Sequence, residues 1–345
     1  STPLYSSAAS DVYKRQEEIL WNFSMPCAFK SEQEIKVAEY GTTNSGMLKH
    51  IYRKGLRLRY GAIMQCVSGI HYNFSLSMES WHSLSNNPDQ DFINDQYLGA
   101  IRNIKRNFWF LLERLGASPI ADESYLLNRK HSLTKHGHND LFLPNATSLR
   151  MSDIGYQSQA QKNLDFKYND LASFLDELKT GIIMPHPEFQ KLGLQDENGK
   201  YQQISDGILQ IENELYDCIR PKRAGKSGQR PYQLLKDQGI QYVEVRGIDL
   251  NPSSLLGITE DQIRVLDLLL IYCIVNDSPE MTDEEKLIIE KTDITTIKYG
   301  REGSSKINYR NSEVPISQAR EHLVENLLLL VNEMDDQEYL SLIHI

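Results

Sequence analysis

Residues 67–76, VSGIHYNFSL, alternate between apolar and polar side chains. This period of two predicts a β-strand, in which Tyr72 and Phe74 lie on the face that packs against the core. The opposite face presents His71 and Asn73, an imidazole and an amide. A strand that faces only water more usually carries threonine, lysine or glutamate there. His71 and Asn73 are therefore candidates for a functional site.

Two later stretches show the same alternation. Residues 240–246, IQYVEVR, place Glu244 and Arg246 on one face, and residues 208–216, ILQIENELY, place two glutamates there. We therefore predict three strands of one sheet. A sheet with one packed and one polar face is usually antiparallel. Its polar face, rich in charged groups, is either a solvated surface or the floor of a site for a charged substrate.

Helical spacing of apolar residues recurs elsewhere in the chain and indicates an α+β fold. Thr259 and Gln262 have the spacing of a capping box, and Asn169 or Asp170 is a candidate cap of another helix. The basic residues concentrate in residues 47–66, the first stretch that we predict to be helical. Residues 121–145 are expected to form a loop. The stretches predicted as helices are residues 47–66, 95–115, 168–179, 259–276, 282–291 and 316–335.

The composition is that of a globular protein, because 40% of the 345 residues are apolar and 24% are charged. No apolar run approaches the roughly 20 residues of a membrane span. A net charge of −10 argues against a general nucleic-acid binder, but it leaves an anionic substrate open. The cysteines lack metal-binding spacing, which predicts reduced thiols and a cytoplasmic protein. They are Cys27, Cys66, Cys218 and Cys273.

Two polar stretches contain residues that suggest phosphate or metal binding. Residues 220–230, RPKRAGKSGQR, contain GKS, but a P-loop needs glycine five residues before Gly225, where Arg220 stands. The residues alone favour a solvated loop over a cradle for nucleotide phosphates. Residues 131–140, HSLTKHGHND, hold three histidines without the ligand geometry that zinc requires, so we expect a polar loop.

Longer blocks, in order along the chain, carry a resemblance to one family. They are YGTTNSG (40–46), YRKGLRLRYGAIMQCVSGIHYNFSL (52–76), ASPI (117–120), NATSLRMSDIGY (145–156), LQIENELYDCIRPKR (209–223) and YVEVR (242–246). The sequence resembles bacterial glutamate–cysteine ligase from about Trp21 to about Ser278. The resemblance implies a glutamine-synthetase-like fold: a bent, mainly antiparallel sheet with helices on one side and a substrate funnel on the other.

The resemblance also implies a reaction and its participants. ATP phosphorylates the γ-carboxylate of L-glutamate, and the amine of L-cysteine then attacks the acyl phosphate to give γ-glutamylcysteine, the first step of glutathione synthesis. ATP is a co-substrate, and Mg²⁺, or alternatively Mn²⁺, is the implied metal. Another ATP-dependent carboxylate–amine ligase of the same fold, or a non-catalytic binding fragment, are the alternatives. No nucleic-acid or membrane partner is implied; the oligomeric state stays open, with a monomer as one option.

By this resemblance, each matched residue acquires an expected role. The expected catalytic residues are Arg246 and His71. The expected metal ligands are Glu244 and His71. Arg150 resembles a clamp for a substrate carboxylate, and Gln65 and Asn73 resemble contacts to glutamate or the metal shell. The expected walls of the cysteine pocket are Tyr52, Arg53, Tyr156 and Tyr216. The nucleotide phosphates would contact Arg220, Lys222 and Arg223. The resemblance therefore favours phosphate binding by residues 220–223, whereas the residues alone favoured a solvated loop.

The chain departs from the family at its ends. The family opens with a strand of GxExE-type carboxylates, and no such segment precedes Trp21. Glu244, helped by Glu212 or Glu214, is then the carboxylate left for a metal, so we expect this chain to be inactive on its own. Residues 1–16 and 341–345 are similar to translated sequencing-adapter sequence, and residues 17–340 would form one incomplete catalytic domain.

Overall fold

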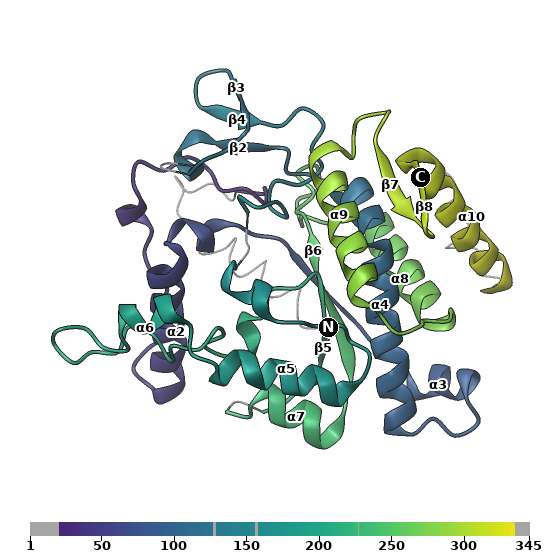
Figure 1. Cartoon of the computed structure of the whole chain (residues 1–345), viewed down its shortest axis with the longest axis horizontal. Coiled ribbons are helices and arrows are strands. Elements are labelled where there is room, and N and C mark those ends of the chain that lie inside the picture. The colour runs from purple at the N-terminus through teal and green to yellow at the C-terminus, as the bar shows by residue number, and fades with distance from the viewer. Residues whose placement is uncertain (1–20, 127–128, 156–157, 227, 335–345) are drawn as a thin grey trace.

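A computed structural model describes residues 21–126, 129–155, 158–226 and 228–334 (Figure 1). It confirms the α+β prediction. The helices are α2 (Asn44–Tyr60), α3 (Met78–Leu84), α4 (Gln90–Leu115), α5 (Leu171–Ile183), α6 (Pro187–Leu192), α7 (Pro231–Gln238), α8 (Glu260–Val275), α9 (Asp283–Tyr299) and α10 (Ile316–Met334). The strands are β1 (Ile70–Phe74), β2 (Ile120–Asp122), β3 (Thr134–His136), β4 (Asp140–Phe142), β5 (Ile219–Lys222), β6 (Tyr242–Ile248), β7 (Lys306–Tyr309) and β8 (Ser312–Pro315).

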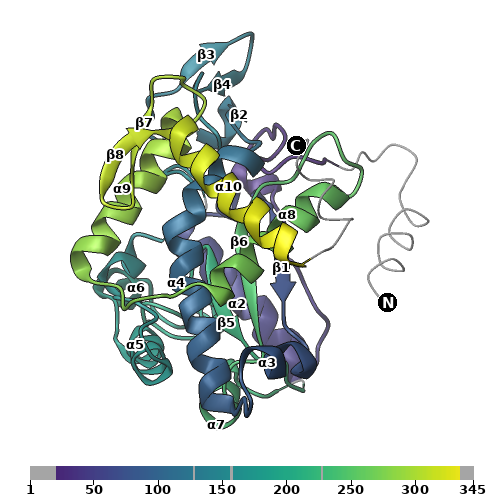
Figure 2. The ribbon, with the colours of Figure 1, turned by 90° about the vertical axis from the view of Figure 1, so that its right-hand side faces the viewer.

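The central sheet has the order β1–β6–β5, and both pairings are antiparallel. The predicted strands around residues 70 and 244 are therefore confirmed as β1 and β6. Tyr72 lies opposite Val245, and Val243 and Val245 are fully buried on the apolar face. Helix α4 runs along this face beside β5 and β6 (Figures 1 and 2). The side chains of β6 thus alternate between the core and the polar face.

Helix α4 forms the centre of the core, as the predicted helix over residues 95–115 required. It begins earlier than predicted, because the Asp89 carboxylate accepts from the Phe92 backbone N–H and caps the first turn. Tyr97, Ile101 and Ile104 have no exposed surface. Helices α8 and α9 pack against α4 on the side away from the sheet, so the sheet has helices on one face.

Capping residues set the ends of several other helices. Asp170 caps α5, and Thr259 forms the predicted capping box of α8 with Gln262. Helix α2 begins after the cap Thr43 and ends at Gly61, which has φ +86°, so the prediction of a helix to residue 66 was too long. Helices α9 and α10 confirm the last two predicted helices, although α9 continues to Tyr299.

The predicted strand over residues 208–216 is wrong. This stretch is irregular and contains a short 3₁₀ turn, Glu212–Glu214. The Glu214 carboxylate accepts from the backbone N–H of Gln210 at 2.7 Å, so a side chain satisfies the amide that a strand would pair with its neighbour. The third strand of the sheet is instead β5, which begins at Ile219.

A second, smaller sheet has the order β2–β4–β3 and lies in the region predicted to be a loop. Its strands have three residues each, which is too short to produce a readable period in the sequence. A separate hydrophobic cluster that includes Tyr125 and Leu141 lies beneath it. Within the described residues, no helix is both long enough and apolar enough to cross a membrane. The predicted tails, 1–16 and 341–345, lie outside the described residues.

Candidate functional site

The polar face of the central sheet gathers six of the predicted site residues. Asn73 of β1 and Arg220 of β5 both lie opposite Glu244 of β6 in the strand register. Opposite residues of antiparallel strands point to the same face, and so do residues two apart on one strand. This face therefore carries His71, Asn73, Arg220, Lys222, Glu244 and Arg246.

Glu244 is the centre of this group and is 8% exposed. Its Oε2 lies 2.8 Å from Arg220, 3.6 Å from Lys222 and 3.8 Å from Arg246. Its Oε1 faces Nδ1 of His71 at 3.6 Å. Burial alone would raise the pKa of Glu244, but His71 and the charge of Arg220 together hold this pKa well below its usual value.

Three cations, Arg220, Lys222 and Arg246, surround one carboxylate, Glu244, so this face has an excess of positive charge. Burial, together with the charge of Arg220, lowers the pKa of Lys222. Arg246 donates to the carbonyl oxygen of Leu215 at 3.1 Å and directs Nε toward Nε2 of His71 at 3.4 Å. An anion that entered beside these groups would be stabilised by charge-assisted hydrogen bonds. The face is therefore suited to phosphate or carboxylate groups.

Arg150 lies behind Arg246, a few residues after Ser148 on the segment that follows β4. Its guanidinium donates to the carbonyl oxygen of Arg246 at 2.6 Å and lies 3.5 Å from the carboxylate of buried Asp249. Asp249 in turn accepts from the hydroxyl of Ser118 at 2.6 Å. Arg150 thus holds the backbone at Arg246. Its role as a clamp for a substrate carboxylate stays a prediction, and a clamp at this place would act from a buried position.

The predicted acceptor-pocket residues lie on three separate segments. Tyr52 and Arg53 are neighbours on α2, and the Arg53 guanidinium lies 5.9 Å from the centre of the Tyr52 ring. Gln65, just after α2, donates to the carbonyl oxygen of Arg53 at 3.3 Å. Tyr216 precedes β5, with its ring edge-on to Tyr60 at 6.4 Å. Tyr156 lies outside the described residues, so its place in this group stays a prediction.

A buried ion pair connects α2 to the segment that carries Tyr216. The side chains of Arg59 and Glu214 are fully buried and lie 3.4 Å apart. Tyr60 donates to the same carboxylate at 3.2 Å. Burial, followed by the charge of Glu214, raises the pKa of Tyr60, so its hydroxyl remains a donor. This network fixes α2 relative to residues 203–214.

Glu212 and Glu214, predicted as helpers of a metal site, are not on the polar face of the sheet. Their segment is not a strand, Glu214 pairs with Arg59, and Glu212 accepts from Arg230 at 2.9 Å. Both carboxylates are therefore engaged elsewhere. Among the described residues, no group of three or more histidine, cysteine, aspartate or glutamate side chains could hold a metal ion. The loop predicted over residues 131–140 is wrong in part, because Thr134–His136 form β3 and pair with β4.

The basic segment 220–230 divides after its first residues. Arg220 and Lys222 belong to β5 and face Glu244, but Arg223 turns away. Arg223 donates to the carbonyl oxygen of Gly239 at 2.5 Å and to the side chain of Gln90 at 3.0 Å. It therefore ties the end of β5 to the beginning of α4, a position apart from the other two cations.

Sequence reasoning did not identify the residues that support the site from behind. Arg59 and Asp249 are charged and buried, but each partner lies about 100 residues or more away in the chain. No local pattern indicates such a pair. The spacing of Glu244 and Arg246, by contrast, is visible because both lie on one face of one strand. The sequence signal that could have pointed to Arg59 is a charged residue among the apolar positions of an amphipathic helix.

Known proteins resemble this chain over most of its length. The family model described as glutamate-cysteine ligase matches residues 5–295. A glutamate–cysteine ligase of Pseudomonas savastanoi pv. phaseolicola is 42% identical over 331 residues, which are 94% of this chain and 62% of that protein. One from Hahella chejuensis is 45% identical over 289 residues, 82% of this chain and 55% of that protein. The chain thus spans about three-fifths of the length of such relatives.

Solved structures show the same relationship. A glutamate–cysteine ligase from Francisella tularensis, solved in complex with AMP, superposes with a TM-score of 0.90 at 32% identity, covering 98% of this chain and 69% of that one. A bifunctional glutathione synthetase from Pasteurella multocida shares the fold, with a TM-score of 0.70 at 22% identity over 98% of this chain and 38% of that one. The order of the strands, the residues on the polar face and these matches lead to one conclusion: the chain belongs to the glutamate–cysteine ligase family.

Proposed function

We propose that this chain provides the nucleotide- and substrate-binding sheet of an enzyme that joins L-glutamate to L-cysteine. The observation that carries the proposal is the polar face of the sheet, where Arg220, Lys222 and Arg246 surround a single carboxylate, Glu244. Family membership supplies the reaction, and the AMP bound by the Francisella relative supports a nucleotide as one ligand.

The proposed reaction has two steps. An oxygen of the glutamate γ-carboxylate attacks the γ-phosphorus of ATP, forming an acyl phosphate as the bond to ADP breaks. The amine of cysteine then attacks the carbonyl carbon, loses a proton and displaces phosphate. In both steps negative charge moves between oxygens, and fixed cations stabilise it without rearranging. Arg246 suits the transferred phosphoryl group because its planar guanidinium can donate two parallel hydrogen bonds.

The remaining roles follow from position. Arg220 and Lys222 would contact the nucleotide phosphates from β5, whereas Arg223 would act by holding the end of that strand. His71, between Glu244 and Arg246, would orient both groups. Arg150 would keep the backbone of Arg246 in place and face substrate through the rest of its guanidinium. The other proposed substrate contacts are Gln65, Asn73, Tyr52, Arg53, Tyr156 and Tyr216.

A magnesium ion, or manganese, is part of the proposal. The donors on the polar face are one carboxylate, Glu244, and one imidazole, His71. Mg²⁺ favours six oxygen ligands and often takes one or two carboxylates together with substrate phosphates and water. The pair therefore fits such an ion only when phosphate oxygens complete its shell. When bound, the ion would neutralise phosphate charge.

The proposed setting is the cytoplasm, and the oligomeric state stays open, with a monomer as one option. All four cysteines are free thiols in the structure, which supports a reducing compartment.

Two measurements test the proposal. Titration calorimetry on this chain should show ATP binding that weakens by about tenfold or more in Arg246→Gln, by loss of a charge-assisted contact. Arg264→Gln is the matched control, because Arg264 pairs with Glu260 on the surface of α8. An enzyme of full family length that contains this chain should release ADP only when both amino acids are present and should form γ-glutamylcysteine, detected by mass spectrometry.

The second measurement also identifies the acceptor. ADP release that depends equally on alanine or glycine would indicate another carboxylate–amine ligase of this fold. ATP binding that is unchanged in Arg246→Gln would contradict the assignment of the polar face.

A further inference from the structure

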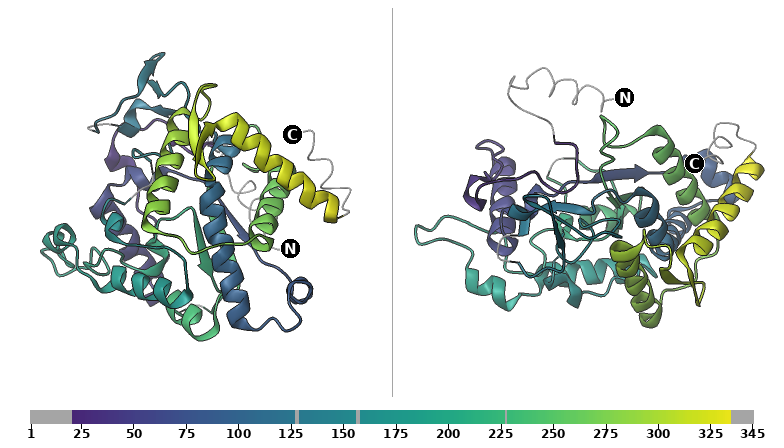
Figure 3. Two further views of the ribbon diagram at one scale, coloured as in Figure 1. Left: turned by 45° about the vertical axis from the view of Figure 1, so that its right-hand side comes forward. Right: turned by 90° about the horizontal axis from the view of Figure 1, so that it is seen from above.

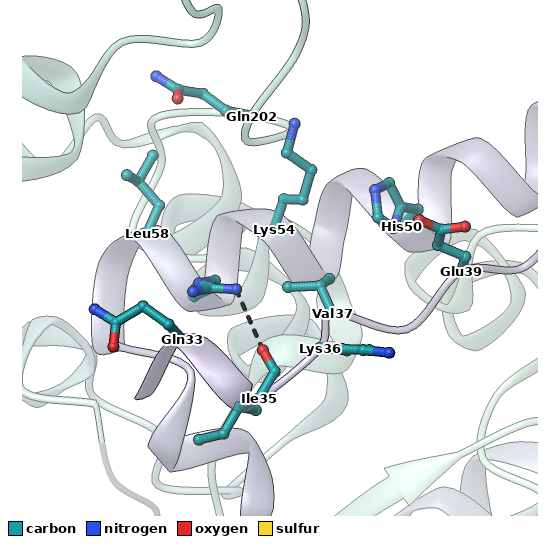
Figure 4. Close-up of a pocket in the computed structure, with 10 residues that line it drawn as sticks. Gln33, Ile35, Lys36, Val37, Glu39, His50, Lys54, Leu58 and Gln202 are labelled. Carbon is teal, nitrogen blue, oxygen red and sulfur yellow. Dashed lines mark hydrogen bonds between the residues drawn. The ribbon is translucent and has the colours of Figure 1, made fainter. Parts of the chain in front are cut away.

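A second basic region lies at the far edge of the molecule. An open cavity of about 950 Å³ is formed between α2 and the segment at residues 33–39, which begins in a short 3₁₀ turn, and Gln202 closes one side (Figure 4). Helix α2 and helix α10 lie at opposite ends of the molecule, so this cavity is remote from α10 (Figures 1 and 3). The proposed reaction does not use its side chains.

Helical spacing aims a row of basic side chains into the cavity. His50, Lys54 and Arg57 are separated by four and three residues, so they share one face of α2. This face differs from the one that carries Tyr52 and Arg59. The basic stretch seen in the sequence is thus divided by the helix between two surfaces.

The cavity wall is held in place by these same side chains. Arg57 donates to the carbonyl oxygen of Ile35 at 3.3 Å, the dashed line in Figure 4. A ring nitrogen of His50 lies 2.8 Å from the carbonyl oxygen of Ala38, and Lys54 donates to that of Tyr201 at 3.2 Å. Arg57 and Lys54 each use one donor on a neutral carbonyl and retain others. A wall fixed in this way is organised before a ligand arrives.

The charge of the lining is positive. Lys36, Lys54 and Arg57 face the cavity together with one carboxylate, Glu39. None of the three cations lies within ion-pair distance of a carboxylate among the residues that the structure describes, but backbone hydrogen bonds and, to a lesser extent, the charge of Lys54 lower the pKa of Asp196. This local excess occurs in a chain of net charge −10. Aliphatic side chains also line the cavity, which leaves room for the carbon skeleton of an organic ligand.

We propose that this cavity binds a small organic or inorganic anion that carries at least two negative charges, at a site separate from the polar face of the sheet. Arg57 and Lys54 would hold the anion by charge-assisted hydrogen bonds, and Lys36 would add attraction from the opposite wall. The cavity is lined by residues of α2, residues 33–39 and Gln202, and none of these has a role in the proposed ligase reaction.

Calorimetry with two probes tests the proposal and identifies the ligand chemistry. Pyrophosphate represents phosphate ligands, and citrate represents polycarboxylates. Pyrophosphate should bind the chain at two sites, one of which is lost in Arg246→Gln and the other in Lys54→Gln/Arg57→Gln, each with an affinity loss of about tenfold or more. Citrate that binds in Arg246→Gln but not in the double variant would identify a carboxylate ligand.

Matched variants separate charge from structure. Lys36 makes no hydrogen bond or ion pair with another described residue, so Lys36→Gln removes a charge without loosening the wall. It should weaken the cavity site by about threefold. Lys49→Gln removes the same charge from α2 outside the cavity, where Lys49 lies 5.8 Å from the Tyr40 ring, and should have no effect. Unchanged binding of both probes in the double variant would overturn the proposal while leaving the ligase assignment intact.

Discussion

The carbonyl oxygen of Leu215 and the ring of His71 help to fix the plane of the Arg246 guanidinium. Arg246→Ala in the complete enzyme should lower kcat by about 10² or more, which is the usual effect of losing one preorganised donor at a developing charge. Arg246→Lys should not restore the rate, because an ammonium lacks the bidentate fork. Steady-state ADP release measures both. A lysine variant with near wild-type turnover would contradict the role at the phosphoryl group.

The acid stability of the protein should depend on Glu244. Its pKa is lower in the folded chain than its ordinary value, so its stabilisation is complete above about pH 4.5 and is lost as the pH falls toward the folded-state pKa. Glu244→Gln should lower the free energy of unfolding by about 3 kcal/mol at pH 7, because it leaves buried Arg220 uncompensated. The difference from wild type should shrink steadily below pH 4.5.

Urea unfolding between about pH 2 and pH 8 measures this dependence. Glu260→Gln removes a carboxylate from an exposed pair on α8 and should change stability by about 0.5 kcal/mol or less at any pH. An equal pH dependence in wild type and Glu244→Gln would show that other carboxylates govern acid unfolding.

At the scale of elements, the guanidinium of Arg59 makes several of the contacts that attach α2 to residues 203–214. Arg59 donates to Gln203 at 3.0 Å and to the carbonyl oxygen of Gly207 at 3.1 Å, and it stacks 4.1 Å from the centre of the Phe189 ring. Arg59→Met should therefore lower the unfolding free energy by about 3–5 kcal/mol, because Glu214 is left buried without its partner. Chemical denaturation gives the value.

The double variant Arg59→Met/Glu214→Leu is the control for this element. If the loss comes from an uncompensated charge, removing the second charge should recover part of the stability, since apolar pairs often replace buried ion pairs at little cost. A double variant that is as unstable as the sum of the two single variants would assign the effect to packing around Phe189 instead.

The elements that could be predicted are those whose pattern is local. Strands β1 and β6 carry their alternation within five and seven residues, and α8 carries its capping box at Thr259. Residues 208–216 alternate just as clearly, but Arg59 and Tyr60 of a distant helix draw Glu214 inward. An alternating pattern of apolar and polar residues shows that a segment has two different faces, but it does not show which groups contact each face. The contacts of Glu214 with Arg59 and Tyr60 therefore determined the conformation of this segment.

The same limit applies to the candidate site. The polar face could be predicted because Glu244 and Arg246 share a strand, and the resemblance to a family added the basic end of β5. The turned-away position of Arg223 and the buried contacts of Arg150 depend on Gly239 and Asp249, which no spacing rule connects to them.

At the scale of the whole molecule, metal dependence should be weak in this chain. The described polar face has three cations and one carboxylate, so metal-free ATP, which is more negative than its Mg²⁺ complex, should bind at least as tightly as the complex. Calorimetry with excess EDTA and with excess Mg²⁺ compares the two. Binding that requires Mg²⁺ would mean that further carboxylates, beyond Glu244, reach the nucleotide.

Turnover by the chain as printed should be at least tenfold below that of a complete family member. Glu244 is the one carboxylate on the described polar face, and phosphoryl transfer normally uses a metal held by more than one ligand. Cysteine-dependent ADP release compares the two proteins. Rates within about tenfold, a barrier difference of only ~1.4 kcal/mol, would show that the described residues suffice.

The pairing of β1 with β6 also constrains the order of events during synthesis. Tyr72 meets Val245, about 170 residues later in the chain. At a translation rate of roughly 5–20 residues per second, β1 waits about 9–35 s for its partner, with its apolar face uncovered. Pairings of such long range also slow folding. His71 and Glu244 come together only at that late stage, so a nascent chain has no phosphate-binding face, and exposed β1 is the segment that a chaperone would be expected to hold.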